Sequence, residues 1–149
     1  MKVVFDSNII IDFLNGDDRA REAISRYKKS FISAVTWMEV MIGCNEEESV
    51  IARNFLNSFT IIQTNPEICS LAVDIRKARK IKLPDALIQA TCESIDALLI
   101  TRNIKDFPEN LDFVKVPYSL WELTTNIHPL QKNLDELQVK LIKSQTKIA

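Results

Sequence analysis

Apolar and polar residues follow one another along the chain in a pattern typical of strands that alternate with helices. Short apolar runs such as "KVVF" and "ALLIT" predict buried strands, and stretches with apolar residues three and four positions apart predict helices. The pattern places strands at 2–6, 30–35, 59–64, 97–101 and 112–117, and helices at 8–14, 18–29, 36–42, 46–58, 66–80 and 82–94. This order predicts an α/β fold with a mainly parallel central sheet flanked by helices.

The last part of the chain has a different pattern. Its leucines, spaced by four, three and four positions, predict an amphipathic helix; they are Leu130, Leu134, Leu137 and Leu141. We therefore expect one domain over residues 1–124 and an amphipathic C-terminal helical extension over 125–149. The sequence leaves open whether the apolar stripe packs on its own domain, on a second copy or on a partner protein.

Composition and charge narrow the function further. The chain has 149 residues, which is enough for one domain with an ordinary core, and a net charge of −1, so any nucleic acid must bind through a local basic patch. No run of about 18 apolar residues is present, and the first residues enter a strand at once. We expect a cytoplasmic protein that does not contact a membrane.

Two scarce residue types exclude several kinds of chemistry. Only Gly16 and Gly43 are present, which excludes the clustered glycines of phosphate-binding and dinucleotide-binding loops. The single histidine, His128, lies in the polar C-terminal part, which argues against a histidine base or a histidine-rich zinc site. Carboxylates remain as the main catalytic material.

Four acidic residues stand at places where a carboxylate needs an explanation, and each has a purely structural one. Asp6 ends the first strand and is placed to cap the following helix. Glu39 follows Thr36 at the capping-box spacing. Asp85 lies in the first turn of a helix, where the dipole stabilises an anion, and Asp106 lies in a turn after a buried strand.

Taken together, the same four residues suggest a metal site. In an open parallel sheet, ligands bind beyond the carboxyl ends of the strands, and Asp6 and Asp106 follow such ends. If the helices of Glu39 and Asp85 begin at the same edge, four carboxylates face one cleft, where like charges raise one another's pKa. A divalent cation relieves this repulsion, and ligands that offer only oxygen favour Mg²⁺ or Mn²⁺.

The chain resembles a known family in four segments that occur in the right order. They are "VVFDSNIIIDFL", "SAVTWMEVMIG", "LPDALIQATC" and "LLITRNIKDF", and they lie within a domain that runs from residue 3 to about 117. These segments are similar to those of PIN-domain ribonucleases, and most closely to VapC-type toxins of toxin–antitoxin pairs. The resemblance implies a three-layer PIN-like fold, metal-dependent hydrolysis of RNA phosphodiester bonds, a homodimer, and a cognate antitoxin as partner.

The resemblance also implies roles for individual residues. Asp6, Glu39, Asp85 and Asp106 are carried over as catalytic ligands of Mg²⁺ or Mn²⁺, directly or through water. Supporting roles fall on polar residues beside them, in which Ser7 and Asn8 orient the first aspartate and Thr101 and Asn103 belong to the "TRN" segment. Whether one or two ions bind is left open.

A basic cluster precedes Asp85, and we predict that it binds RNA phosphates together with two cations of the "TRNIKDF" segment. The predicted set is Arg76, Lys77, Arg79, Lys80, Lys82, Arg102 and Lys105. The alternative is a solvated helix end, where cations are favourable for the dipole.

Two other functions compete with this one. An aspartate-nucleophile phosphatase needs a second Asp two residues after the nucleophile, and Asn8 occupies that position. A catalytically inactive PIN-like module that binds RNA or protein is the main alternative, although all four acids are present. The sequence does not name the RNA or the antitoxin.

Overall fold

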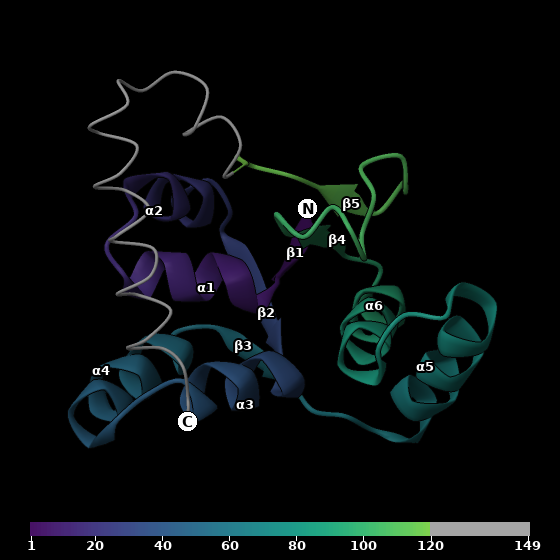
Figure 1. The fold of residues 1–149 in the computed structure, drawn as a ribbon, viewed down its shortest axis with the longest axis horizontal. Coiled ribbons are helices and arrows are strands. Elements are labelled where there is room, and N and C mark those ends of the chain that lie inside the picture. Colours follow the sequence, from purple (N-terminus) through teal and green to yellow (C-terminus); the bar gives the residue numbers. More distant parts are fainter. Residues whose placement is uncertain (120–149) are drawn as a thin grey trace.

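The computed structural model describes residues 1–119, which form five strands and six helices (Figure 1). The strands are β1 Lys2–Phe5, β2 Lys29–Ser33, β3 Thr60–Ile62, β4 Leu98–Ile100 and β5 Val114–Lys115. The helices are α1 Ser7–Leu14, α2 Asp18–Ser25, α3 Ala34–Ile42, α4 Glu46–Leu56, α5 Pro66–Arg79 and α6 Leu83–Ile95. The predicted order of elements is confirmed. The predicted domain boundary at 124 and the extension over 125–149 lie outside the described residues.

All five strands run parallel in one sheet, in the order β3-β2-β1-β4-β5. The central strand β1 therefore has β2 on one side and β4 on the other, and Phe5 pairs with Ile100. Open α/β sheets bind ligands beyond the carboxyl ends of their strands, at the point where the strand order reverses. In this sheet that point lies at β1. Asp6 and Thr101 are the next residues at this edge.

Two layers of helices cover the sheet, which confirms the predicted three-layer α/β fold. Val3 and Phe5 pack into a core shared with α1, α2, α3 and α4, whereas Val4 packs on the other face with Ile88 of α6. Figure 1 shows α1–α4 on one side of the strands and α6 on the other, with α5 packed outside α6. Both faces of β1 are buried, which explains why its sequence is a continuous apolar run.

Side chains that cap the helices determine where they begin. The Asp6 carboxylate accepts from the N–H of Ser7 at the start of α1, as the structural explanation of this residue predicts. Helix α3 starts at Ala34, two residues before the predicted position, because the Ser33 side chain caps it. Helix α6 begins after Lys82 without a side-chain cap. No helix among residues 1–119 is long and apolar enough to cross a membrane.

Candidate metal centre

Asp6 lies at the carboxyl end of β1 and is almost completely buried, with 4% of its surface exposed. Its Oδ1 accepts from the backbone N–H of Ser7 at 2.8 Å. Its Oδ2 accepts from the Thr101 hydroxyl at 2.7 Å and from Asn8 Nδ2 at 3.1 Å. Three donors thus hold this carboxylate in one orientation, and its two oxygens keep lone pairs for a further partner.

The segment after β4 lies beside Asp6, and the two together form one wall of the site, the β1–β4 wall. Thr101 is fully buried, and its hydroxyl accepts from the backbone N–H of Asn103 at 3.0 Å while it donates to Asp6. Asn103 and Asp106 bond to each other twice, from Asn103 Nδ2 to Asp106 Oδ2 at 3.0 Å and from the Asp106 N–H to Asn103 Oδ1 at 3.3 Å. The predicted supporting residues Asn8, Thr101 and Asn103 therefore connect Asp6 to Asp106.

Glu39 reaches the same edge from α3. Its Oε1 accepts from the Ser7 hydroxyl at 2.8 Å. The capping-box explanation of Glu39 is wrong, because Ser33 caps α3 and the hydroxyl oxygen of buried Thr36 has no hydrogen-bond partner among residues 1–119. Ser7 thus links two predicted ligands, because its backbone N–H donates to Asp6 and its hydroxyl donates to Glu39.

Asp85 lies in the first turn of α6 and is the electrostatic centre of the group. Burial, together with the charges of Asp6 and Asp106, raises its pKa to about 6, against the opposing effect of Lys82. Burial also raises the pKa of Glu39, to which the charge of Asp85 adds. Asp85 therefore interacts with each of the other three predicted ligands.

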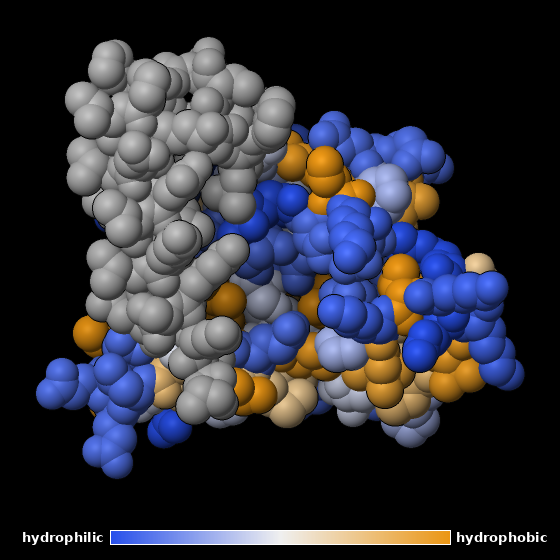
Figure 2. All heavy atoms as spheres, viewed as in Figure 1, coloured by the Kyte–Doolittle hydropathy of each residue, from blue (hydrophilic) through white to orange (hydrophobic). Residues whose placement is uncertain are grey.

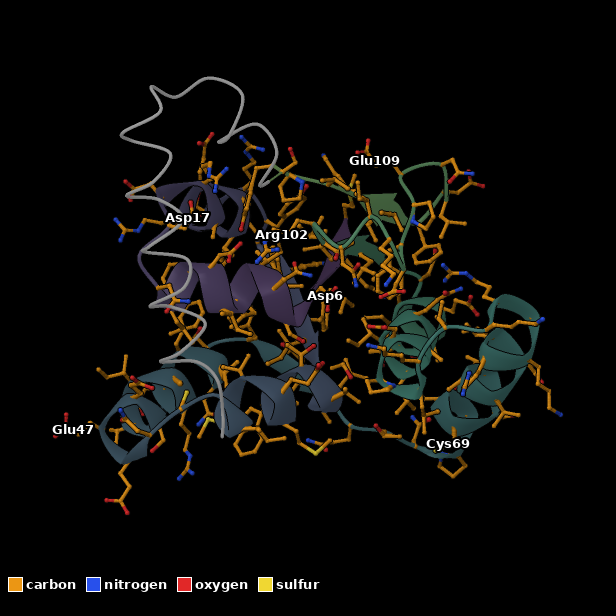
Figure 3. The ribbon with its side chains drawn as sticks, in the orientation of Figure 1. Asp6, Asp17, Glu47, Cys69, Arg102 and Glu109 are labelled. Atoms are coloured by element: carbon orange, nitrogen blue, oxygen red, sulfur yellow. The ribbon has the colours of Figure 1, made fainter. Side chains whose placement is uncertain are left out.

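Asp6 shows the same stress on the other wall. Burial raises its pKa, the donors Thr101 and Ser7 lower it, and the charge of Glu39 raises it. Each of the four carboxylates thus repels at least one of the others. Figure 3 shows Asp6 between α1 and α6, and in the same orientation Figure 2 shows hydrophilic residues over the middle of this face.

The carboxylates are neighbours without forming a completed ligand set. Among residues 1–119, no three side chains of Asp, Glu, His or Cys are arranged to hold a metal ion as they stand. The donor set consists of carboxylate oxygens, the type that Mg²⁺ and Mn²⁺ prefer, and its mutual repulsion favours a cation. The residues therefore fit a hard divalent ion, provided that their side chains turn towards a common point.

The structure divides the predicted RNA-binding set into two groups. Its three arginines bond to protein groups: Arg76 to the Ile81 carbonyl at 2.8 Å, Arg79 to Gln89 and the Asp106 carbonyl, and Arg102 to Asp12. Its four lysines are exposed, and their side chains make no hydrogen bond or ion pair within the described part of the chain; they are Lys77, Lys80, Lys82 and Lys105.

Two residues near the site, Asp12 and Gln89, have partners that the sequence does not indicate. Asp12 of α1 accepts from Arg102 and from the Tyr118 hydroxyl. Gln89 of α6 binds Arg79. The only signal for Asp12 is its position one and a half turns after Asp6, which by itself indicates an ordinary helix residue.

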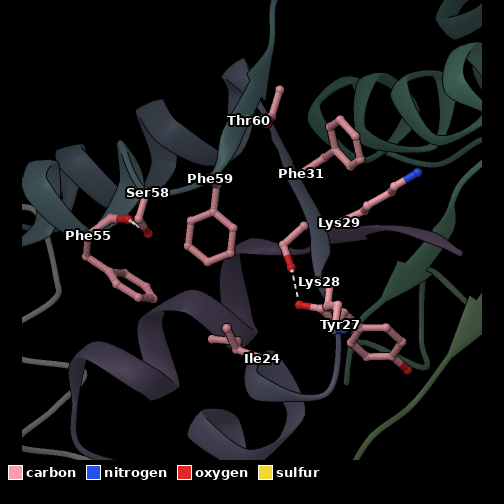
Figure 4. Close-up of a pocket in the computed structure, with 10 residues that line it drawn as sticks. Ile24, Tyr27, Lys28, Lys29, Phe31, Phe55, Ser58, Phe59 and Thr60 are labelled. Atoms are coloured by element: carbon pink, nitrogen blue, oxygen red, sulfur yellow. Dashed lines mark hydrogen bonds between the residues drawn. The ribbon is translucent and has the colours of Figure 1, made fainter.

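Two cavities lie away from these residues. One of about 410 Å³ opens at the amino end of β2 and β3, between Tyr27, Lys28, Phe55 and Phe59 (Figure 4). The carboxylates follow the other end of the strands, and none of them lines this cavity. The metal-site prediction depends on the side-chain arrangement at the carboxyl edge and not on a closed pocket.

Comparison with known proteins identifies the family to which this fold belongs. The family model of the PIN domain matches residues 3–110. A chain of a toxin–antitoxin complex from Klebsiella pneumoniae is 38% identical, with 80% of this chain and 100% of that chain covered and a TM-score of 0.76. Comparison with curated protein sequences gives no match.

Two more distant structures share the fold. A chain of VapBC-1 from nontypeable Haemophilus influenzae is 26% identical, with 72% of this chain and 90% of that chain covered and a TM-score of 0.60. A chain of DNA-bound VapBC from Salmonella typhimurium is 19% identical, with 80% and 98% covered and a TM-score of 0.67. The chain belongs to the PIN-domain family. Its predicted resemblance to VapC-type toxins is confirmed.

Proposed function

We propose that this protein is a metal-dependent endoribonuclease that acts as the toxin of a toxin–antitoxin pair. The observation that supports the activity is the cluster of four carboxylates at the carboxyl edge of the sheet, in which Asp85 interacts with each of the others. The antitoxin partner is supported by the toxin–antitoxin complex that is 38% identical over the whole length of the aligned chain. A homodimer and a cytoplasmic location complete the proposal.

Each part of the site has a task in this reaction. Asp6, Glu39, Asp85 and Asp106 would hold Mg²⁺ or Mn²⁺, which when bound supplies positive charge that activates water and stabilises the leaving oxygen of the phosphodiester. Ser7 and Thr101 hold two of these carboxylates in place through hydrogen bonds of 2.8 and 2.7 Å. The exposed lysines after α5 and in the "TRNIKDF" segment bind the RNA backbone; Lys82 lies close enough to lower the pKa of Asp85.

The test compares Asp6→Asn with Asp74→Asn, an identical change at an exposed position of α5. RNA cleavage is followed with Mg²⁺, with Mn²⁺ and with EDTA, and Mn²⁺ binding is measured by calorimetry. We expect Asp6→Asn to lose at least about 100-fold in cleavage, since even outer partners of a metal ligand cost about 10- to 100-fold. Asp74→Asn should cleave RNA and bind Mn²⁺ as the parent does.

Two outcomes would contradict the proposal. Full cleavage by Asp6→Asn would show that this carboxylate is not part of the active site. Absence of Mn²⁺ binding by the parent, together with absence of cleavage, would favour the catalytically inactive binding module.

A further inference from the structure

We propose that Arg102 is a positioning residue: paired with Asp12, it fixes the segment that carries Thr101 and Asn103 and thereby sets the geometry of the carboxylate cluster. This assigns to Arg102 a role other than the predicted contact with RNA phosphate. The part of the proposal that concerns metal binding depends on the proposed function, whereas the part that concerns the segment itself does not.

The first observation is that the guanidinium of Arg102 pairs with Asp12 through two of its nitrogens. Its Nε donates to Asp12 Oδ2 at 2.6 Å and its Nη2 to Asp12 Oδ1 at 3.0 Å, the two-pronged geometry that makes such pairs strong. The side chains of Arg102 and Asp12 are 23% and 13% exposed. A phosphate that took the Nε and Nη2 donors would leave the Asp12 carboxylate without its cationic partner in a mostly buried place, which is costly.

The second observation is where the pair holds the chain. The backbone N–H of Arg102 donates to Asn8 Oδ1 at 3.2 Å. Helix α1 therefore binds Arg102 at two points: Asn8 binds its backbone and Asp12 binds its side chain. The residue before Arg102 donates to Asp6, and the residue after it bonds to Asp106. Movement of Arg102 would therefore disturb contacts to two predicted ligands at once.

The third observation is that Asp12 is itself supported from the other side. The Tyr118 hydroxyl donates to Asp12 Oδ2 at 2.8 Å. The Arg19 guanidinium lies 4.6 Å from the centre of the Tyr118 ring and pairs with Asp17 at 2.7 Å. Figure 3 shows Arg102 between Asp6 and Asp17, so this series of contacts runs from the start of α2 to the site.

The charge state of the pair agrees with this role. Burial alone would lower the pKa of Arg102, but the hydrogen bond and the charge of Asp12 raise it above its usual value. Burial raises the pKa of Tyr118, and the charge of Asp12 raises it further, so the phenol stays a donor. Lys105, three residues after Arg102, is exposed and has no such partner among residues 1–119, which leaves it available for phosphate.

The experiment compares Arg102→Gln, Arg102→Lys, Asp12→Asn and the double variant Asp12→Asn/Arg102→Gln with the parent. The matched control is Arg26→Gln, which breaks an exposed arginine–glutamate pair of 2.7 Å on the rim of α2. Three quantities are measured: Mn²⁺ affinity by calorimetry, kcat and KM for RNA cleavage, and the salt dependence of binding to a short fluorescent RNA in EDTA.

We expect Arg102→Gln and Asp12→Asn each to weaken Mn²⁺ binding by about 10-fold and to lower kcat more than they raise KM. The double variant should be no worse than either single one, because both remove the same pair. Arg102→Lys, which keeps the charge but not the two-pronged contact, should recover only part of the loss. The salt slope should stay at the parent value, and Arg26→Gln should match the parent throughout.

The opposite pattern would overturn the proposal. If Arg102→Gln binds Mn²⁺ like the parent but lowers the salt slope by about one, Arg102 is a phosphate contact. Additive losses in the double variant would show that the two residues act separately.

A readout that needs no metal separates this proposal from the proposed function. In Asp12→Asn, amide hydrogen exchange at Arg102 and Asn103 should accelerate while the amides of β1 and β2 remain protected. If the parent binds no Mn²⁺, the metal centre is wrong and the positioning role is judged by this exchange alone. Unchanged protection at both amides would overturn it.

Discussion

The two walls of the carboxylate cluster are built in different ways. On the β1–β4 wall, Asp6 is buried and held by three neutral donors, from Ser7, Asn8 and Thr101. On the α6 wall, Asp85 is only partly buried, no neutral donor among residues 1–119 bonds to it, and its main neighbours are other anions. One wall is thus organised by hydrogen bonds within the protein, whereas the other is under repulsion between carboxylates, which a bound cation would relieve.

This difference suggests how the site takes up an ion. Asp6 provides a fixed point, because its orientation follows from the sheet and from the "TRN" segment. Asp85 has no such neutral donors among residues 1–119, and it would join the ligand set by turning towards an ion held beside Asp6. The arrangement explains why the carboxylates are neighbours and yet no three of them within the described residues form a ready ligand set.

The largest effect on stability should come from the organised wall. In Thr101→Val, the buried charge of Asp6 loses a donor at 2.7 Å and the Asn103 N–H loses its acceptor, so we expect a loss of about 2 kcal/mol in the free energy of unfolding. Urea unfolding in EDTA measures it. Thr101→Ser, which keeps the hydroxyl, is the control, and a Val variant as stable as the Ser variant would show that Asp6 does not depend on this bond.

A smaller effect is expected where the two walls begin to meet. Ser7→Ala removes the hydroxyl that donates to Glu39 at 2.8 Å, but Glu39 is only partly buried and water can replace the donor. We expect a loss of about 1 kcal/mol, below that of Thr101→Val, in the same unfolding assay. A greater loss than in Thr101→Val would contradict the distinction between the two walls.

The smallest effect, and one of opposite sign, belongs to the stressed wall. Asp85→Asn removes the charge that repels Asp6, Asp106 and Glu39, so the metal-free variant should melt at a slightly higher temperature than the parent. Added Mn²⁺ should raise the melting temperature of the parent and not that of the variant. A lower melting temperature for the variant in EDTA would show that Asp85 makes a stabilising contact and is not under repulsion.

Much of this arrangement could be predicted because its signals are local in sequence. A carboxylate directly after a buried strand places Asp6 at the sheet edge, and alternation of strands and helices predicts the parallel sheet. The capping-box interpretation of Glu39 was wrong because Ser33 caps α3. The spacing to Glu39 in the sequence favours Thr36 instead, which lies inside the helix.

The tasks of the arginines could not be predicted in the same way. Asp12 and Arg102 are 90 positions apart, and Arg79 meets the carbonyl of Asp106 across 27. A basic residue near an acidic site is equally suited to bind phosphate or to brace a loop, and only the three-dimensional neighbours of its guanidinium decide between them. The exposed lysines remain predicted RNA contacts, because none of their side chains has a partner within residues 1–119.

The pairing of β1 with β4 has a consequence for the order in which the chain is made. Phe5 pairs with Ile100, and Thr101 binds Asp6 from 95 positions away. A ribosome that has released the segment through α5 has already delivered two of the four acids, yet the strand that orients the first of them has not emerged. Contacts of such long range form late, so the orientation of Asp6 is completed only after the final strands have been made and have docked.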